Sequence, residues 1–199
     1  EVTAPIPRRI RGRVRVIPRA LNARDFAIDA SMRHRWTPIA PASRIEVELD
    51  APRLRWTGDA YLDANHGDEP LADRLREWQW SRVHLGERTA VVYDVTDRAG
   101  AQTMLALDFG PDGTIDAFDP PERVRLTRTR WRIARSMRSA TTLARVERTL
   151  EDTPFYARSL VVGELLGRTA TAMHESLDLD RLRSPIVQAM LPFRMPRRA

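Results

Sequence analysis

The sequence predicts a mainly β protein whose antiparallel strands close as barrels or sandwiches. Segments in which apolar and polar residues alternate recur along the chain, and that alternation is the period of a half-buried strand. Short stretches rich in Gly, Pro and Asp separate these segments, and Pro111-Asp112-Gly113 is typical of a hairpin turn. Helical periodicity is scarce. Many short strands at this spacing favour a closed antiparallel architecture.

The first expected strand runs from Arg9 to Val16, where arginines occupy the odd positions. One face of this strand is therefore basic, and we expect it to dock on anionic lipid or, equally, to be a merely solvated surface. The later alternating segments are Phe26 to Ala30, Arg44 to Leu49, Leu75 to Leu85, Thr89 to Val95, Thr103 to Phe109, Val124 to Ile133, Thr142 to Leu150 and Thr169 to His174.

One short helix is expected near the C-terminal end, from Ser184 to Leu191. Ser184 is a residue type that caps helices, and Pro185 suits the first helical position. Pro192 then stops the helix because it cannot continue the backbone hydrogen bonds.

Composition excludes several classes of protein. The chain is 42% hydrophobic and 30% charged, which is typical of a soluble globular protein, and no window approaches the roughly eighteen apolar residues of a membrane-spanning helix. The net charge of +6 comes from arginine alone, because lysine is absent. Without cysteine there are no disulfides or thiolate metal sites.

Familiar cofactor and metal motifs are also missing from the sequence. The four histidines show no metal-ligand spacing, and no P-loop, dinucleotide fingerprint or nucleophile elbow is present. The stacking motif of RNA-recognition domains is absent as well. We therefore expect no metal, no cofactor and no nucleic-acid partner.

Three groups of aromatic and polar residues occur at a spacing of two, which places their side chains on one face of a strand. If these faces converge inside a barrel, rings would surround a single carboxyl group. Each group also has a structural interpretation: core filling for Trp-x-Trp, a strand that ends in an Asx turn for Tyr-x-Asp, and a hydrogen-bonded structural residue for a lone His. The groups are His34 with Trp36; Tyr61 with Asp63 and Asn65; and Trp78 with Trp80 and Arg82.

Four longer motifs extend across nearly the whole chain. They are His34 to Pro41; Gly58 to Leu71 continued by Trp78 to Arg82; Glu151 to Ser159; and His174 to Arg181 through Met190 to Arg197. In this order they resemble the carotenoid 1,2-hydratases, also called hydroxyneurosporene synthases. His66 departs from the family, which often has Phe or Trp at that position.

The resemblance implies two lipocalin-like β-barrel domains. Residues 1–55 would be the remainder of a first domain, incomplete because chains of this family begin with a further N-terminal segment, and residues 56–199 would be the second. It also implies a cofactor-independent hydro-lyase that adds water across the terminal double bond of acyclic carotenoids such as neurosporene and lycopene. The implied setting is the cytoplasm of photosynthetic bacteria, peripheral to the inner membrane.

The motif match assigns catalytic roles to His34, Trp36, Tyr61 and Asp63. Asp63 would protonate the alkene to give a tertiary carbocation, and burial among aromatic rings would keep this acid protonated. The ring faces would stabilise the cation, and His34 would orient the attacking water or accept its proton.

Four further residues are expected to contact the substrate, namely Trp78, Trp80, Asn65 and Tyr156. The alternative function is a non-catalytic lipocalin-like carrier of an apolar ligand. Asp63 discriminates between the two, because a carrier has no use for a buried, unpaired carboxyl group.

Overall fold

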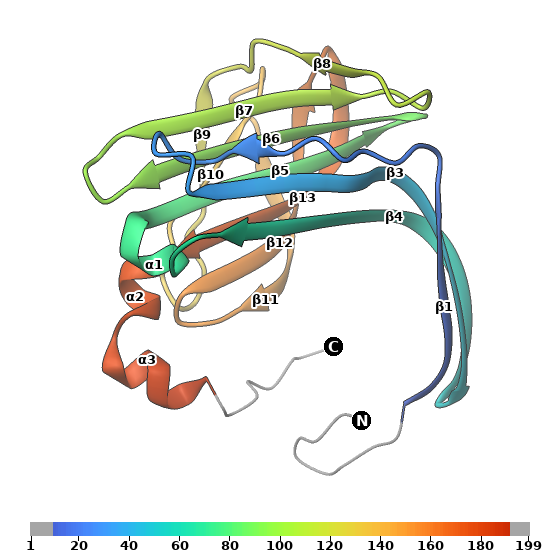
Figure 1. The fold of residues 1–199 in the computed structure, drawn as a ribbon, viewed down its shortest axis with the longest axis horizontal. Helices are drawn as coiled ribbons and strands as arrows, with labels where there is room; N and C mark the ends of the chain where they lie inside the picture. Colours follow the sequence, from blue (N-terminus) through green and yellow to red (C-terminus); the bar gives the residue numbers. More distant parts are fainter. Residues whose placement is uncertain (1–9, 192–199) are drawn as a thin grey trace.

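The computed structural model describes residues 10–191 as a strand-rich fold with three short helices (Figure 1). The elements are β1 (Arg11–Pro18), β2 (Phe26–Ala27), β3 (His34–Ala51), β4 (Arg53–Gly67), α1 (Leu71–Arg74), β5 (Leu75–Leu85), β6 (Arg88–Asp97), β7 (Gln102–Phe109), β8 (Ile115–Ala117), β9 (Arg123–Leu126), β10 (Arg135–Arg138), β11 (Arg145–Asp152), β12 (Tyr156–Leu165), β13 (Arg168–Asp178), α2 (Leu179–Leu182) and α3 (Pro185–Met190). All the strand pairings among them are antiparallel.

The main sheet has seven strands in the order β11-β12-β13-β5-β6-β7-β8. Because successive side chains point to opposite sides of a strand, this sheet has two faces of different character. The first face carries Trp78, Trp80 and Tyr93, and the second carries Ser81 and His174. Register fixes the neighbours on each face.

The long hairpin β3–β4 covers part of the first face. Phe26 of β2 and Trp36 of β3 belong to the same buried cluster as Trp80, Tyr93 and Phe109 of the main sheet. Burying these large rings removes apolar surface from water and stabilises the contact by about 25 cal/mol per Å². The pairing of β3 with β4 shifts register at two irregular positions. In Figure 1 both strands bend and continue beside β1.

The far end of the hairpin forms a three-stranded arm with β1. One side of the arm is apolar, with Val14 of β1, Val47 of β3 and Trp56 of β4 in register. The arginines expected to form a basic face are exposed, but acidic residues lie among them. Arg13 lies opposite Glu48, and Arg15 forms an ion pair with Glu46 at 3.0 Å. The face is therefore of mixed charge. Arg9 lies outside the described residues.

The second face of the main sheet is covered by the hairpin β9–β10. Leu126 of β9 and Met137 of β10 pack against Val83, Val92 and Val161 of the main sheet. This interface also buries polar groups. His174 lies 2.9 Å from the Ser81 hydroxyl, and Arg135 donates to the Ser159 hydroxyl at 2.8 Å. Because buried polar groups need partners, this network stabilises the second face.

Most of the expected elements are confirmed, with some corrections. The strand expected from Val124 to Ile133 is wrong beyond Leu126, because the amide of Arg132 donates to the Thr129 carbonyl in a turn. The strand expected from Phe26 to Ala30 ends at Ala27, where the chain enters a turn. Strands β4, β8, β10 and β12 were not among the expected alternating segments. The strand expected from Thr142 begins only at Arg145, because residues 142–143 form a turn.

The C-terminal helix is confirmed as α3 with Pro185 in its first turn, but Ser184 at the N-cap makes no capping hydrogen bond through its side chain. The expected domain boundary at residue 55 falls inside β4. Residues of β4 before and after this boundary both pair with β3, so the boundary does not separate two sheets. The division into two domains stays a prediction.

Candidate functional site

The carboxyl group of Asp63 lies where β3 and β4 meet the first face. Its Oδ2 atom accepts a hydrogen bond from the Trp36 indole Nε1 at 2.7 Å and another from the Tyr61 hydroxyl at 3.1 Å. Among the described residues, no donor contacts Oδ1. Asp63 is half-buried inside β4. It is therefore a strand residue held by side chains of the site, and the interpretation as an Asx turn is wrong.

Aromatic rings surround this carboxyl group. Trp36 has no exposed surface, and its ring lies edge-on to Tyr93 with centroids 5.8 Å apart. Tyr61 contacts Trp80 at 5.3 Å between centroids, and Trp78 lies edge-on to Tyr93 at 5.7 Å. The faces of such rings carry partial negative charge and attract cations.

The electrostatics of the site keep its tyrosines protonated. Burial raises the pKa of Tyr61 well above its usual value, and the neighbouring charge of Asp63 raises it further. Burial likewise raises the pKa of Tyr93, with smaller contributions from Asp63 and Glu175. The Tyr61 hydroxyl therefore remains a hydrogen-bond donor across the physiological pH range.

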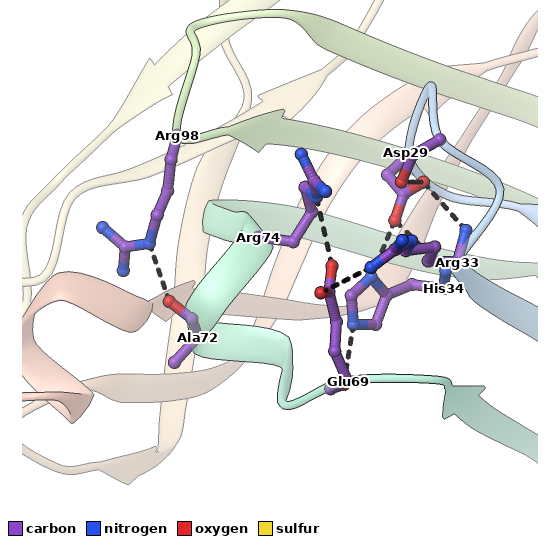
Figure 2. Close-up of polar contacts among 8 residues, drawn as sticks. Asp29, Arg33, His34, Glu69, Ala72, Arg74 and Arg98 are labelled. Atoms are coloured by element: carbon purple, nitrogen blue, oxygen red, sulfur yellow. Dashed lines mark hydrogen bonds and ion pairs between the residues drawn. The ribbon is translucent and has the colours of Figure 1, made fainter.

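His34 occupies a separate buried network (Figure 2). Its Nδ1 lies 2.7 Å from Oδ2 of Asp29, and its Nε2 lies 3.0 Å from the carbonyl oxygen of Glu69. A carbonyl oxygen only accepts, so Nε2 donates to it. Both ring nitrogens are thus bonded to protein groups. Although His34 and Trp36 share a face of β3, the structure does not bring the imidazole to Asp63 by any described contact.

The network around His34 also fixes the loop after β4. Arg33 and Arg74 both pair with the carboxylate of Glu69, each at 3.1 Å. Hydrogen bonds, above all that from His34, outweigh the effect of burial and lower the pKa of Asp29. Figure 2 shows these side chains between the segment before β3 and helix α1. This arrangement is that of a structural clamp.

The four residues expected to contact substrate occupy different surroundings. Trp78 and Trp80 lie on the first face beside the Asp63 site. The Asn65 side chain is exposed and accepts only a long bond of 3.4 Å from the Tyr93 hydroxyl. Tyr156 lies on β12, where the guanidinium of Arg158 stands 5.7 Å from its ring centroid. Their contact with substrate stays a prediction.

Sequence reasoning missed several residues of this region. Tyr93 and Phe109 contact Trp36, at 5.8 and 6.3 Å between centroids. The guanidinium of Arg82 lies 5.2 Å from the ring centroid of Tyr61. Tyr93 and Phe109 lie in predicted strands. The spacing of residues within one strand, however, does not indicate which residues of another strand they contact. For Arg82 the sequence did give an indication, because its spacing of two from Trp80 places both side chains on one face of the strand.

The geometry suits acid chemistry on an apolar molecule. A carboxyl group with one oxygen held by two donors and one oxygen free can carry a proton on the free oxygen. The two hydrogen bonds stabilise the carboxylate left after proton transfer. Among residues 10–191, no three His, Asp or Glu side chains form a metal site, and no helix is long and apolar enough to cross a membrane.

Comparison with known proteins identifies relatives over the whole chain. The family model described as carotenoid hydratase CrtC matches residues 1–199. The acyclic carotenoid 1,2-hydratase of Thiocapsa roseopersicina is 58% identical over 99% of this chain and 49% of the relative. The protein of the same name from Rubrivivax gelatinosus is 53% identical over 100% of this chain and 50% of the relative. This chain thus spans about half the length of these relatives.

A solved structure supports the fold class. A putative AttH from Nitrosomonas europaea is similar with a TM-score of 0.50 and 14% sequence identity, over 84% of this chain and 59% of that chain. At this identity the likeness concerns the fold alone. It confirms the predicted mainly antiparallel, lipocalin-like architecture.

Proposed function

The chain belongs to the carotenoid hydratase CrtC family, and we propose that it adds water to the terminal double bond of an acyclic carotenoid without a cofactor. The relatives named acyclic carotenoid 1,2-hydratase supply the substrate class. The hydrogen bonds to Asp63 support its role as the acid, because they leave one carboxyl oxygen free and would stabilise the carboxylate formed by proton transfer.

In the proposed reaction, Asp63 gives its proton to the alkene carbon that bears hydrogen. The positive charge then develops on the neighbouring carbon with two methyl groups, where a tertiary cation is most stable. Trp36 and Tyr61 donate to Oδ2, which stabilises the carboxylate as it forms. The rings of Tyr61 and Trp80 contact each other next to this carboxyl group. Each ring can stabilise the cation by about 0.5 to 2 kcal/mol.

His34 takes a positioning role in this proposal. Asp29 and the Glu69 carbonyl engage both of its ring nitrogens, so neither nitrogen is available to orient the attacking water. The imidazole instead holds the start of β3, two residues before Trp36.

The alternative of a non-catalytic carrier is less well supported. Holding a hydrocarbon needs apolar surface only, and a carboxyl group among aromatic rings serves no purpose in such a site. Acyclic carotenoids partition into lipid, so we also propose that the protein works at the surface of the inner membrane on the cytoplasmic side. Neurosporene and lycopene are the substrates to test.

The test is a direct assay of the purified chain. The protein is incubated with neurosporene or lycopene in liposomes, and the extracted carotenoids are analysed by mass spectrometry for the gain of one or two waters. We expect hydrated product from wild type and none from Asp63→Asn. Bound but unchanged carotenoid with wild-type protein would favour the carrier.

A further inference from the structure

A second carboxyl group, that of Glu175, lies on the first face close to the Asp63 site. Glu175 on β13 is in register with Trp80 on β5 and with Arg158 on β12, so the three side chains form a row across the sheet. Trp80 contacts the ring of Tyr61, whose hydroxyl donates to Asp63. The two carboxyl groups therefore flank one pair of aromatic rings.

Arg158 holds the Glu175 carboxylate through one of its two oxygens. Nε and Nη2 of Arg158 both contact Oε1, each at 2.9 Å. Oε2 is not used by this ion pair. The Glu175 side chain is only 21% exposed, so it is directed mostly into the protein. As in Asp63, one carboxyl oxygen of Glu175 faces two donors. Glu175 also interacts with the Tyr156 hydroxyl, whose pKa is raised by burial and further by the charge of Glu175.

The partners of the two carboxyl groups differ in charge. Asp63 accepts from an indole and a phenol, which are neutral, whereas Glu175 pairs with a guanidinium. A cationic partner favours the ionised form of a carboxyl group more strongly than a neutral donor does. The unlike partners are our reason for assigning the acid role to Asp63 and the base role to Glu175.

Two indole N–H groups on the same face of the sheet as Glu175 are suited to bind a water molecule. The indole Nε1 atoms of Trp78 and Trp80 are buried and have no hydrogen-bond acceptor among the described residues. Trp80 is only 7% exposed. Because buried N–H groups nearly always have a partner, these two donors point to an acceptor that the described chain does not supply. Water can accept from an indole while donating to a carboxylate.

We propose, resting on the proposed function, that Glu175 is the general base of the hydration and that its Oε2 accepts a proton from the attacking water. The alkene takes the proton of Asp63 and becomes a tertiary cation. A lone pair of the water oxygen forms the C–O bond, one O–H bond of that water breaks, and its proton passes to Glu175. Proton return from Glu175 to Asp63 through solvent restores both groups.

The experiment separates formation of the cation from its capture. Wild type, Glu175→Gln and Asp63→Asn are incubated with lycopene in D₂O, and both hydrated product and deuterium in recovered lycopene are measured by mass spectrometry. Glu175→Gln keeps the acid, so the cation forms and reverts. Recovered lycopene should therefore gain deuterium while hydration falls roughly hundredfold. Asp63→Asn should give neither. Glu87→Gln, which removes an exposed ion pair to Arg19 elsewhere, is the matched control and should behave as wild type.

The outcomes are distinguishable. Hydration by folded Glu175→Gln at the wild-type rate overturns the role of Glu175 and leaves the proposed function intact. Loss of deuterium incorporation together with hydration, in a folded variant, also overturns it, because the base is not needed to form the cation. A wild-type protein that yields neither hydrated product nor deuterated lycopene overturns the proposed function and the role of Glu175 with it.

A second variant covers the case in which Glu175→Gln does not fold. Glu175→Asp keeps the negative charge opposite Arg158 but withdraws the carboxylate by about 1 Å, a displacement that can cost about a hundredfold in rate. Hydration should therefore fall further than deuterium incorporation. An equal fall in both would overturn the proposal.

Discussion

Replacing Asp63 with Asn changes the chemistry of the site and almost nothing of its shape. An amide oxygen can still accept from the Trp36 indole and the Tyr61 hydroxyl, which contact the native carboxylate at 2.7 and 3.1 Å. The amide cannot, however, deliver a proton to carbon. We therefore expect Asp63→Asn to fold, to bind carotenoid and to lose hydration.

The magnitudes follow from these two contacts. A hydrogen bond to a charged group contributes about 1.5 to 3 kcal/mol and a neutral one about 0.5 to 1.5 kcal/mol. Both bonds persist in the variant but weaken by about 1 to 1.5 kcal/mol each, so the free energy of unfolding should change by no more than about 3 kcal/mol. Loss of a general acid lowers rates by roughly 10² to 10⁴.

The assay compares product yield with ligand binding. Hydrated carotenoid is quantified by mass spectrometry, binding by quenching of tryptophan fluorescence, and stability by urea unfolding. Asp50→Asn, at an exposed position near the end of β3, is the matched control. Hydration by Asp63→Asn at the wild-type yield would show that the acid lies elsewhere. Loss of binding along with activity would show that the carboxyl group is structural.

Further predictions concern the site, the second face and the arm. Trp36→Phe removes the indole N–H but keeps a ring, and turnover should fall about ten- to hundredfold, the equivalent of one hydrogen bond to a charged group; unchanged turnover would refute that bond's role. Burial, with a smaller effect of nearby positive charge, lowers the pKa of His174 to about 3, against about 6.5 in an unfolded chain. Its contribution to stability is complete above about pH 6.5 and is lost as pH falls towards 3, so His174→Gln should flatten the pH dependence of urea unfolding in that range. Replacing Arg11, Arg13 and Arg15 with Gln should weaken co-sedimentation with anionic vesicles at low salt, by at most about 1 kcal/mol per arginine; no change would indicate a solvated surface.

The fold was predictable where polar and apolar residues alternate along one strand. The segment Leu75 to Leu85 matches β5 at both ends, because apolar residues alternate with polar ones from Trp78 to Trp80 and again from Val83 to Leu85. Strand β12 was missed because Leu160, Val161 and Val162 are consecutive apolar residues, which give no alternation. The strand expected beyond Leu126 failed because local hydrogen bonds of Thr129 close a turn there.

The candidate site was predictable within strands but not between them. The spacing of Tyr61 and Asp63 correctly indicates that both lie on one face of β4, and their hydrogen bond shows it. The bond from Trp36 depends on the pairing of β3 with β4, which no pattern within either segment specifies. Tyr93 and Glu175 were missed for the same reason, since their neighbours lie on other strands.

The clamp around His34 explains how a residue that touches no described group of the acid site can still matter for it. His34 is in register with Gly67, and a Cβ atom at Gly67 would lie 2.5 Å from Cδ2 of the imidazole. The glycine therefore lets β4 approach the ring closely while Asp29 and the Glu69 carbonyl hold the ring on either side. The clamp fixes the pairing of β3 with β4 at this end of the hairpin. A slip of that pairing by one residue would turn Asp63 to the opposite face of β4. The clamp thus positions the acid through the backbone, and its loss would separate the Asp63 carboxyl from the Trp36 indole without altering either residue.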